Sequence, residues 1–271
     1  MEAFFEAVPG TGPLLFLHHS PGTASVLGAV LYVHPWAEEM NKSRRMAAKQ
    51  ARSLAEAGFA VLQIDLRGCG DSAGDFSQAS WSGWIEDVHS GAQWLQARYK
   101  APLWLWGLRS GALLATAAAN RVMTDCRLLL WQPAVSGKPL LQQFLRLKAA
   151  ADLEQGDAKT TMEAARREIA AGREVDVAGY RLSPELAAGL EQATLDLPGM
   201  CRHTVWIELS NREEPTLLPA SHAKVAAWRT EGQPMDVQVV PGPAFWQTQE
   251  IEDAPALLQA TTTAMLKAAS P

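Results

Sequence analysis

The stretch LWLWGLRSGALLA, residues 103–115, decides how this chain folds. Its first half is an apolar run typical of a buried strand, and its second half is rich in the small residues of a closely packed helix. Gly107 and Gly111 flank the junction and permit a sharp turn. The central residue of that turn is Arg109. Because a guanidinium group is not deprotonated near neutral pH, Arg109 cannot act as a nucleophile.

Apolar runs and amphipathic segments alternate on both sides of this stretch. The further predicted strands cover residues 4–8, 14–18, 27–33, 59–64, 127–131, 203–209 and 235–240. The predicted helices cover residues 41–57, 82–98, 157–171, 221–230 and 254–268, with one more starting at 183. Strands and helices that alternate at this spacing predict an α/β fold with a mainly parallel sheet covered by helices on both faces.

One segment interrupts the alternation. Residues 137–202 are helix-prone and charge-rich, and Ser183-Pro184-Glu185 carries the N-cap and N1 proline of a helix start. We therefore expect a core in two parts, residues 1–136 and 203–271, with a helical lid inserted at 137–202. The Ala, Glu and Arg side chains of the lid helices could pack on a partner or on a second copy, as a homodimer.

Composition excludes several classes of function. Of 271 residues, 48% are hydrophobic and 20% charged, which is ordinary for a globular protein. The net charge of −5, without a basic run, argues against nucleic acid as a partner. The first residues lack the charge and apolar run of a signal peptide, and no apolar run approaches the ~18–20 residues that span a bilayer.

The spacing of cysteines and histidines argues against structural disulfides and metal sites. Cys69, Cys126 and Cys201 are an odd number without a CxxC pair, which fits a reducing cytoplasm without structural disulfides. The six histidines have no metal-ligand spacing except the adjacent His18 and His19, which are typical of a strand edge. We therefore expect neither a metal nor a cofactor. We expect the partner to be a small-molecule substrate or ligand.

Five stretches together resemble the α/β-hydrolase superfamily. They are residues 33–45 (VHPWAEEMNKSRR), 65–76 (DLRGCGDSAGDF), 103–115, 128–133 (LLLWQP) and 245–251 (FWQTQEI). Within the superfamily they resemble the exosortase A system-associated hydrolase 2 family. That resemblance implies a cytoplasmic bacterial protein linked to exopolysaccharide production, with an α/β-hydrolase fold and a hydrolase label inferred from the fold.

The superfamily's chemistry needs a serine at the apex of a G-x-S-x-G turn, a carboxylate after a late strand, and a histidine after the last strand. The apex here is Arg109, and no histidine follows residue 241. The acid could be Glu213 or Glu214, or Glu208 at the end of the strand before them. Two of the three positions therefore lack the residue that ordinary acyl transfer requires.

Substitutes for the missing groups can be named, each with a structural alternative. Ser110 could be the nucleophile and His34 the base, since both are expected beside one crevice. The alternatives are a helix-opening serine that bonds to backbone and a hydrogen-bonded strand-end histidine. Cys69 could be a reactive thiolate near His34 and Arg67, or a small residue that fills a tight turn.

The expected crevice also suits a ligand. Its predicted lining is His34, Trp36, Arg67, Cys69, Arg109, Trp131 and Trp246. Arg109, at a helix N-terminus, could bind a carboxylate, phosphate or sulfate. Alternatively Glu38 or Glu39 neutralises it, because an unpaired buried charge costs several kcal/mol.

Three functions remain open from the sequence. The first is a hydrolase with a nonstandard site, acting on an ester, a thioester or an acylated carbohydrate. The second is a catalytically silent relative that binds a small anionic or apolar ligand through Arg109 and the tryptophans. The third is an interaction protein that works through the inserted helices.

Overall fold

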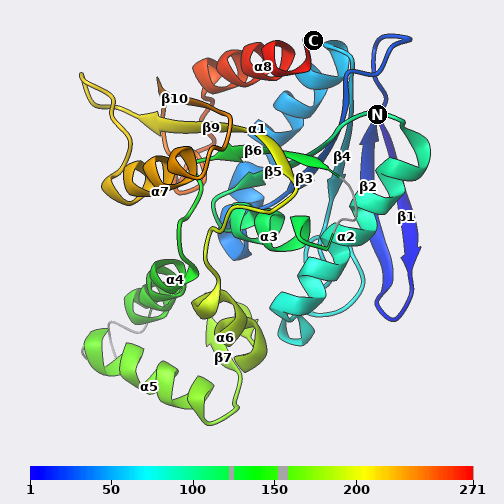
Figure 1. Cartoon of the computed structure of the whole chain (residues 1–271). Helices are drawn as coiled ribbons and strands as arrows, with labels where there is room; N and C mark the ends of the chain where they lie inside the picture. The colour runs from blue at the N-terminus through cyan, green and yellow to red at the C-terminus, as the bar shows by residue number, and fades with distance from the viewer. Residues whose placement is uncertain (122–124, 152–157, 271) are drawn as a thin grey trace.

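The computed structural model describes residues 1–121, 125–151 and 158–270, and its centre is an eight-stranded sheet (Figure 1). The strands of this sheet are β1 (Glu2–Val8), β2 (Gly12–His19), β3 (Gly28–Val33), β4 (Phe59–Ile64), β5 (Leu103–Leu108), β6 (Cys126–Trp131), β9 (Cys201–Ser210) and β10 (Met235–Pro241). Their order across the sheet is β1-β2-β4-β3-β5-β6-β9-β10. Strands β1 and β2 run antiparallel to their neighbours, and all other neighbours are parallel. The predicted α/β fold with a mainly parallel sheet is confirmed.

The strand order reverses at β3, whose neighbours are β4 and β5. The chain leaves β3 toward one edge of the sheet and later returns to its other side. In open parallel sheets, such a reversal opens a crevice at the carboxyl ends of the strands. The turn after β5 lies at this end.

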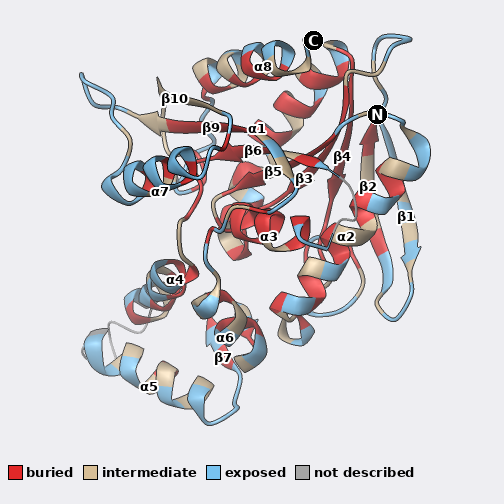
Figure 2. Cartoon of the chain, viewed as in Figure 1, coloured by how far each residue is buried: buried red, intermediate tan, exposed pale blue. Residues whose placement is uncertain are grey.

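Helices cover both faces of the sheet. Helices α1 (Ala37–Glu56) and α8 (Pro255–Ala269) pack on one face, and α2 (Trp81–Arg98), α3 (Ser110–Ala119) and α7 (Pro219–Thr230) pack on the other. The central strands β3, β4 and β5 are buried at every residue, which explains why their sequences are almost entirely apolar (Figure 2). No helix in the described ranges is both long and apolar enough to cross a membrane.

Some element boundaries differ from the sequence expectation. Helix α1 begins at Ala37, four residues before the predicted start, directly after the Pro35-Trp36 turn. Gly58 has the predicted positive φ, +102°, just after that helix. Strand β9 begins at Cys201 rather than at residue 203, because a bulge in its pairing with β6 lengthens it.

The chain between β6 and β9 forms a separate group of elements. They are α4 (Gly137–Ala151), α5 (Ala158–Ala170), α6 (Pro184–Gln192) and a hairpin of β7 (Val175–Val177) and β8 (Tyr180–Leu182). The sequence predicted helices alone, so the hairpin is a correction: three-residue strands are too short to show alternation. The predicted helix start at Asp157 lies outside the described residues.

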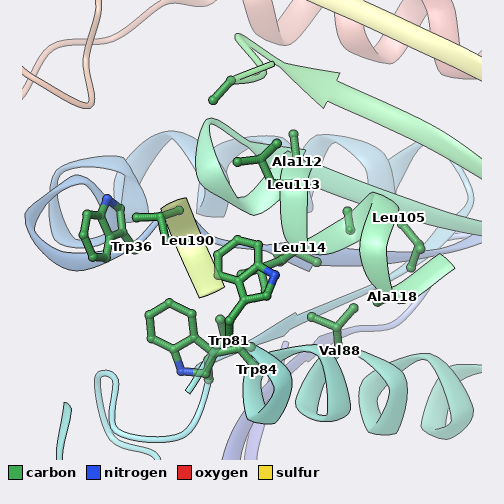
Figure 3. Packing of buried hydrophobic residues seen from close by; sticks show 14 of the residues in the cluster. Trp36, Trp81, Trp84, Val88, Leu105, Ala112, Leu113, Leu114, Ala118 and Leu190 are labelled. Carbon is green, nitrogen blue, oxygen red and sulfur yellow. The ribbon is translucent and has the colours of Figure 1, made fainter. Parts of the chain in front are cut away.

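This inserted group packs against the same face as α2 and α3, away from α8 (Figure 1). Phe144 of α4 contacts Trp36 with ring centroids 4.5 Å apart. Leu190 of α6 and Trp81 of α2 belong to the same buried cluster, as Figure 3 shows. The inserted elements therefore share the main core beside the crevice.

The turn after β5 depends on two close approaches. A Cβ on Gly107 would lie 2.4 Å from the Cα of Ala112, and a Cβ on Gly111 would lie 2.1 Å from the carbonyl oxygen of Val33. Real Cβ atoms do not approach backbone this closely. The first turn of α3 can therefore sit against β5 because residue 107 is glycine, and against the end of β3 because residue 111 is glycine.

We expect Gly111→Ala to lower the free energy of unfolding by about 3–5 kcal/mol, since the backbone it would contact cannot move aside cheaply. Gly199→Ala is the matched control, because a Cβ there meets no atom within 4 Å. Urea unfolding followed by circular dichroism measures both. A Gly111→Ala variant as stable as the Gly199→Ala variant would show that the turn is not tightly constrained.

Candidate functional site at the turn after β5

Arg109 occupies the apex of the turn with a backbone conformation that favours glycine. Its φ is 55° and its ψ is −116°, immediately before α3. Such a conformation costs a non-glycine residue on the order of 1–3 kcal/mol. Its N–H donates to the carbonyl of Trp131 at 3.1 Å, and its own carbonyl accepts from Ala112 and Ala134. These bonds from the end of β6, from the loop after it and from α3 hold the strained residue in place.

The Arg109 side chain turns toward α1 and the inserted helix α4. Its Nε and Nη2 donate to the Glu39 carboxylate at 3.3–3.4 Å. Nη2 also lies 3.5 Å from Oε1 of Gln143 on α4. On another side, the guanidinium carbon is 5.6 Å from the ring centroid of Trp246. Three elements distant in sequence thus meet at this one cation.

Glu39 is the counterion that the sequence analysis offered together with Glu38. Only 4% of the Glu39 side chain is exposed, against 14% for Arg109. Burial raises the pKa of Glu39, and the nearby Arg109 charge opposes that rise only in part. The contacts are also longer than the 2.7–2.9 Å typical of charge-assisted hydrogen bonds. The pair is therefore a loose one that neutralises both charges through long contacts.

A cleft of about 300 Å³ opens beside Arg109 at the carboxyl ends of the strands. Its lining includes Arg109, Gln132, Leu209, Ser210, Ala244 and Trp246. Gln132 also has a positive φ, 40°, and its Oε1 accepts from the N–H of Leu209 at 2.8 Å. Strained non-glycine residues cluster at functional sites. Nη1 of Arg109 donates to no side chain or backbone group in the described ranges.

Ser110 and His34 are both buried, and the side chains of both are hydrogen-bonded to backbone groups. The Ser110 hydroxyl oxygen accepts from the N–H of Trp36 at 2.9 Å. The Nδ1 of His34 contacts the carbonyl of Pro35 at 2.7 Å, and its Nε2 accepts from the N–H of Leu66 at 3.2 Å. Burial lowers the pKa of His34. Its one basic nitrogen is therefore directed at Leu66, and the hydroxyl of Ser110 at Trp36.

The candidate acids do not gather at the turn either. Glu213 and Glu214 are exposed in the loop after β9. Glu208 is buried, and its carboxylate accepts from the indole N–H of Trp206 at 3.0 Å and from the N–H of Leu218 at 3.1 Å. It therefore holds the start of α7 and the core beneath it.

The rest of the predicted crevice lining is divided among separate environments. Arg67 pairs with the fully buried Asp87 at 2.7 Å. Cys69 lines a different pocket of about 260 Å³, and burial raises the pKa of its thiol, which disfavours the thiolate. The placement expected for Trp131 is corrected: its indole lies on the α8 face and donates to Thr261 at 2.8 Å. Only Trp246 joins Arg109 in the cleft.

Sequence reasoning missed Gln143, Gln132 and the other cleft residues Leu209, Ser210 and Ala244. Gln143 reaches Arg109 through tertiary packing of α4, for which the sequence carries no signal. Gln132 could have been suspected, because it follows β6 directly at the carboxyl edge. No group of three or more potential metal ligands occurs among the residues that the structure describes.

Comparison with known protein families identifies one that matches this chain. Residues 24–171, more than half of the chain, match the family Hydrolase_4, described as "Serine aminopeptidase, S33". The chain belongs to this family. The Hydrolase_4 match covers the turn with Arg109 and the helices α4 and α5, and it ends before β9, so the loops after β9 and β10 lie outside it.

Individual proteins are also similar to this chain. The chain is 36% identical to human Protein ABHD12B over 92 residues, 34% of this chain, and it spans about a quarter (24%) of that protein's length. A carboxyl esterase from Bacillus coagulans is similar in fold, with a TM-score of 0.66 at 15% identity over 98% of this chain and 96% of that one. XC6422 from Xanthomonas campestris, an α/β serine hydrolase without lid, is also similar in fold. Its TM-score is 0.59 at 19% identity, over 98% of this chain and 94% of that one.

The Glu39 pKa leads to a prediction about stability and pH. Because the folded pKa is raised above the ordinary value of 4.5, the folded protein binds this proton more tightly than the unfolded chain does. The contribution of Glu39 to stability is full below that ordinary value and is lost as the pH rises through the raised pKa. We expect Glu39→Gln to be at least as stable as the wild type near neutral pH, with an advantage that disappears on acidification.

Urea unfolding of both proteins across this pH range measures the difference. The exposed Glu168 is the matched control, since Arg173 lowers its pKa and the pH dependence of Glu168→Gln has the opposite sign. A Glu39→Gln variant that is clearly less stable than the wild type at neutral pH, by a margin that shrinks in acid, contradicts the expectation.

Proposed function

We propose that this Hydrolase_4 member binds a small organic anion at the apex of its turn instead of presenting a nucleophile there. The observation that carries the proposal is the Arg109 cation at the apex, held loosely by Glu39 and open to the cleft beside Trp246. Arginine binds carboxylates and phosphates through parallel N–H donors. The N-terminus of α3 adds a favourable field for negative charge.

The ligand class follows from the cleft. Its volume, about 300 Å³, is at the lower end for small-molecule sites. Apolar lining by Leu209 and Trp246 suits an apolar chain or a sugar face, and Gln132 and Ser210 offer polar groups. A compact carboxylate with an apolar or sugar body meets these requirements. Its negative charge would take over the role of the Glu39 carboxylate beside Arg109.

We further propose that residues 137–202 act as a lid over a core of residues 1–136 and 203–271. Supporting this, α4 brings Gln143 to Arg109 and Phe144 to Trp36, so movement of α4 would change access to the cation. The resemblance to the exosortase A system-associated hydrolase 2 family supports a more specific context. There, acidic or acylated carbohydrates linked to exopolysaccharide would be the ligands.

Anion binding can be measured by isothermal titration calorimetry with sodium propionate as the probe and neutral propionamide as its isostere. We expect propionate alone to bind, weakly, with Kd on the order of 1 mM. Arg109→Gln should lose at least about tenfold in affinity, since each charge-assisted bond is worth roughly 1.5–3 kcal/mol. Glu39→Gln should gain affinity, because propionate then displaces no internal carboxylate.

Arg173→Gln is the control for loss of an arginine, because Arg173 is exposed on the inserted segment and paired with Glu168. It should bind propionate like the wild type. If Arg109→Gln binds propionate as well as the wild type does, Arg109 is not the anion site.

Hydrolysis is the second candidate, favoured by family membership and by a serine directly after the apex. The buried Ser110 hydroxyl accepts from backbone and has no free base beside it, so we expect no adduct with a fluorophosphonate probe. Mass spectrometry of the treated protein, with an ordinary esterase labelled in parallel, measures this. An adduct on Ser110 that is lost in Ser110→Ala would establish an active serine and favour the hydrolase.

A further inference from the structure

A second chemically distinctive cluster lies at the opposite end of the sheet, where β6 and β9 begin. Cys126 and Cys201 are the first residues of these strands and are direct register partners. Neighbouring strands lie about 4.8 Å apart, within the roughly 4.4–6.8 Å between Cα atoms that a disulfide requires. The two cysteines are separated by the whole inserted segment in sequence and are adjacent in the fold.

The bulge at this point puts Thr204 on the same face of the sheet as the two cysteines. After it, Arg127 pairs with His203 and Leu128 with Thr204, so the strand β9 uses one extra residue. Without the bulge, Cys201 and Thr204 would face opposite sides, because side chains alternate along a strand. With it, the Cys201 sulfur lies 3.6 Å from the Thr204 hydroxyl. Cys126, as the direct register partner of Cys201, has its side chain on this same face.

Other groups complete the surroundings of Cys201. The Nε2 of Gln233 donates to its sulfur at 3.2 Å. Cys126 is buried, whereas Cys201 is partly exposed. The charged groups near the pair are Asp125, which pairs with Arg202 at 2.7 Å, and His203, which bonds to Asp236 at 3.1 Å.

We propose that Cys126 and Cys201 form a reversible disulfide in which Cys201 reacts first with a hydroperoxide and Cys126 resolves the product. In the first step the Cys201 thiolate attacks the O–O bond, giving a sulfenic acid while the peroxide is reduced to an alcohol or water. In the second step the Cys126 sulfur attacks the sulfenic sulfur. An S–S bond forms, the S–O bond breaks, and hydroxide leaves with the Cys126 proton as water.

The assignment of roles follows from the two environments. Donation from Cys126 and from the polar neighbours lowers the pKa of Cys201 to about 7, and the same contact together with burial raises the pKa of Cys126. Cys201 is therefore the nucleophilic and accessible thiol, and Cys126 the protected one. The disulfide would close a loop containing every inserted element and would pin β6 to β9 at its base.

The test is to treat the full chain with one equivalent of hydrogen peroxide, alkylate the remaining thiols, and map the peptides by mass spectrometry. We expect a Cys126–Cys201 linked peptide, a free Cys69, and recovery of all thiols with dithiothreitol. The oxidised protein should unfold about 10 °C higher than the reduced one, because the bond constrains the unfolded chain.

Three variants separate the pair from the remaining cysteine. Cys69→Ala should keep the linked peptide and the thermal shift, whereas Cys126→Ala and Cys201→Ala should lose both. Peptide mapping of the wild type stands independently of how well the variants fold. Three free thiols after peroxide treatment, an overoxidised Cys201 without a linked peptide, or only intermolecular disulfides would each overturn the proposal.

Discussion

The close contact between the first turn of α3 and the end of β3 constrains the whole carboxyl edge of the sheet. Glycine at 111 lets α3 approach the end of β3, glycine at 107 lets α3 approach β5, and Arg109 between them has a positive φ. The chain keeps this costly geometry with arginine at the apex, although arginine is far less suited to it than glycine. Backbone hydrogen bonds from the end of β6 and from α3 hold Arg109 in this geometry.

A largely buried cation at this position needs partners, and the surrounding elements supply them. Helix α1 begins early enough to bring Glu39 to Arg109, α4 brings Gln143, and the loop after β10 brings the ring of Trp246. Glu39 is costly to keep ionised in this environment, as its raised pKa shows. Without a ligand, Arg109 and Glu39 thus form an internal ion pair of modest strength. A ligand anion that enters the cleft would replace Glu39 as the counterion of Arg109.

The sequence predicted the parts of this account that depend on local pattern. Glycine spacing located the turn, alternation located the sheet, and charge balance pointed to a glutamate near Arg109. The apolar run Leu128–Trp131 does not show which face of the sheet each side chain takes, so Trp131 was expected in the crevice although it lies on the α8 face. The contact of Gln143 and the bulge beside Cys201 arise from tertiary packing, which no local pattern encodes.

The most direct test of the central idea observes the Arg109 Nε–H group itself. Its NMR resonance, assigned in ¹⁵N-arginine-labelled protein by its absence in Arg109→Gln, would be followed as sodium propionate is added. The account predicts a saturable shift of this resonance that exceeds the shifts of the other arginine Nε–H signals and is absent with propionamide. An Arg109 resonance that stays fixed while propionate binds elsewhere, or while none binds, would contradict a ligand role for the apex arginine.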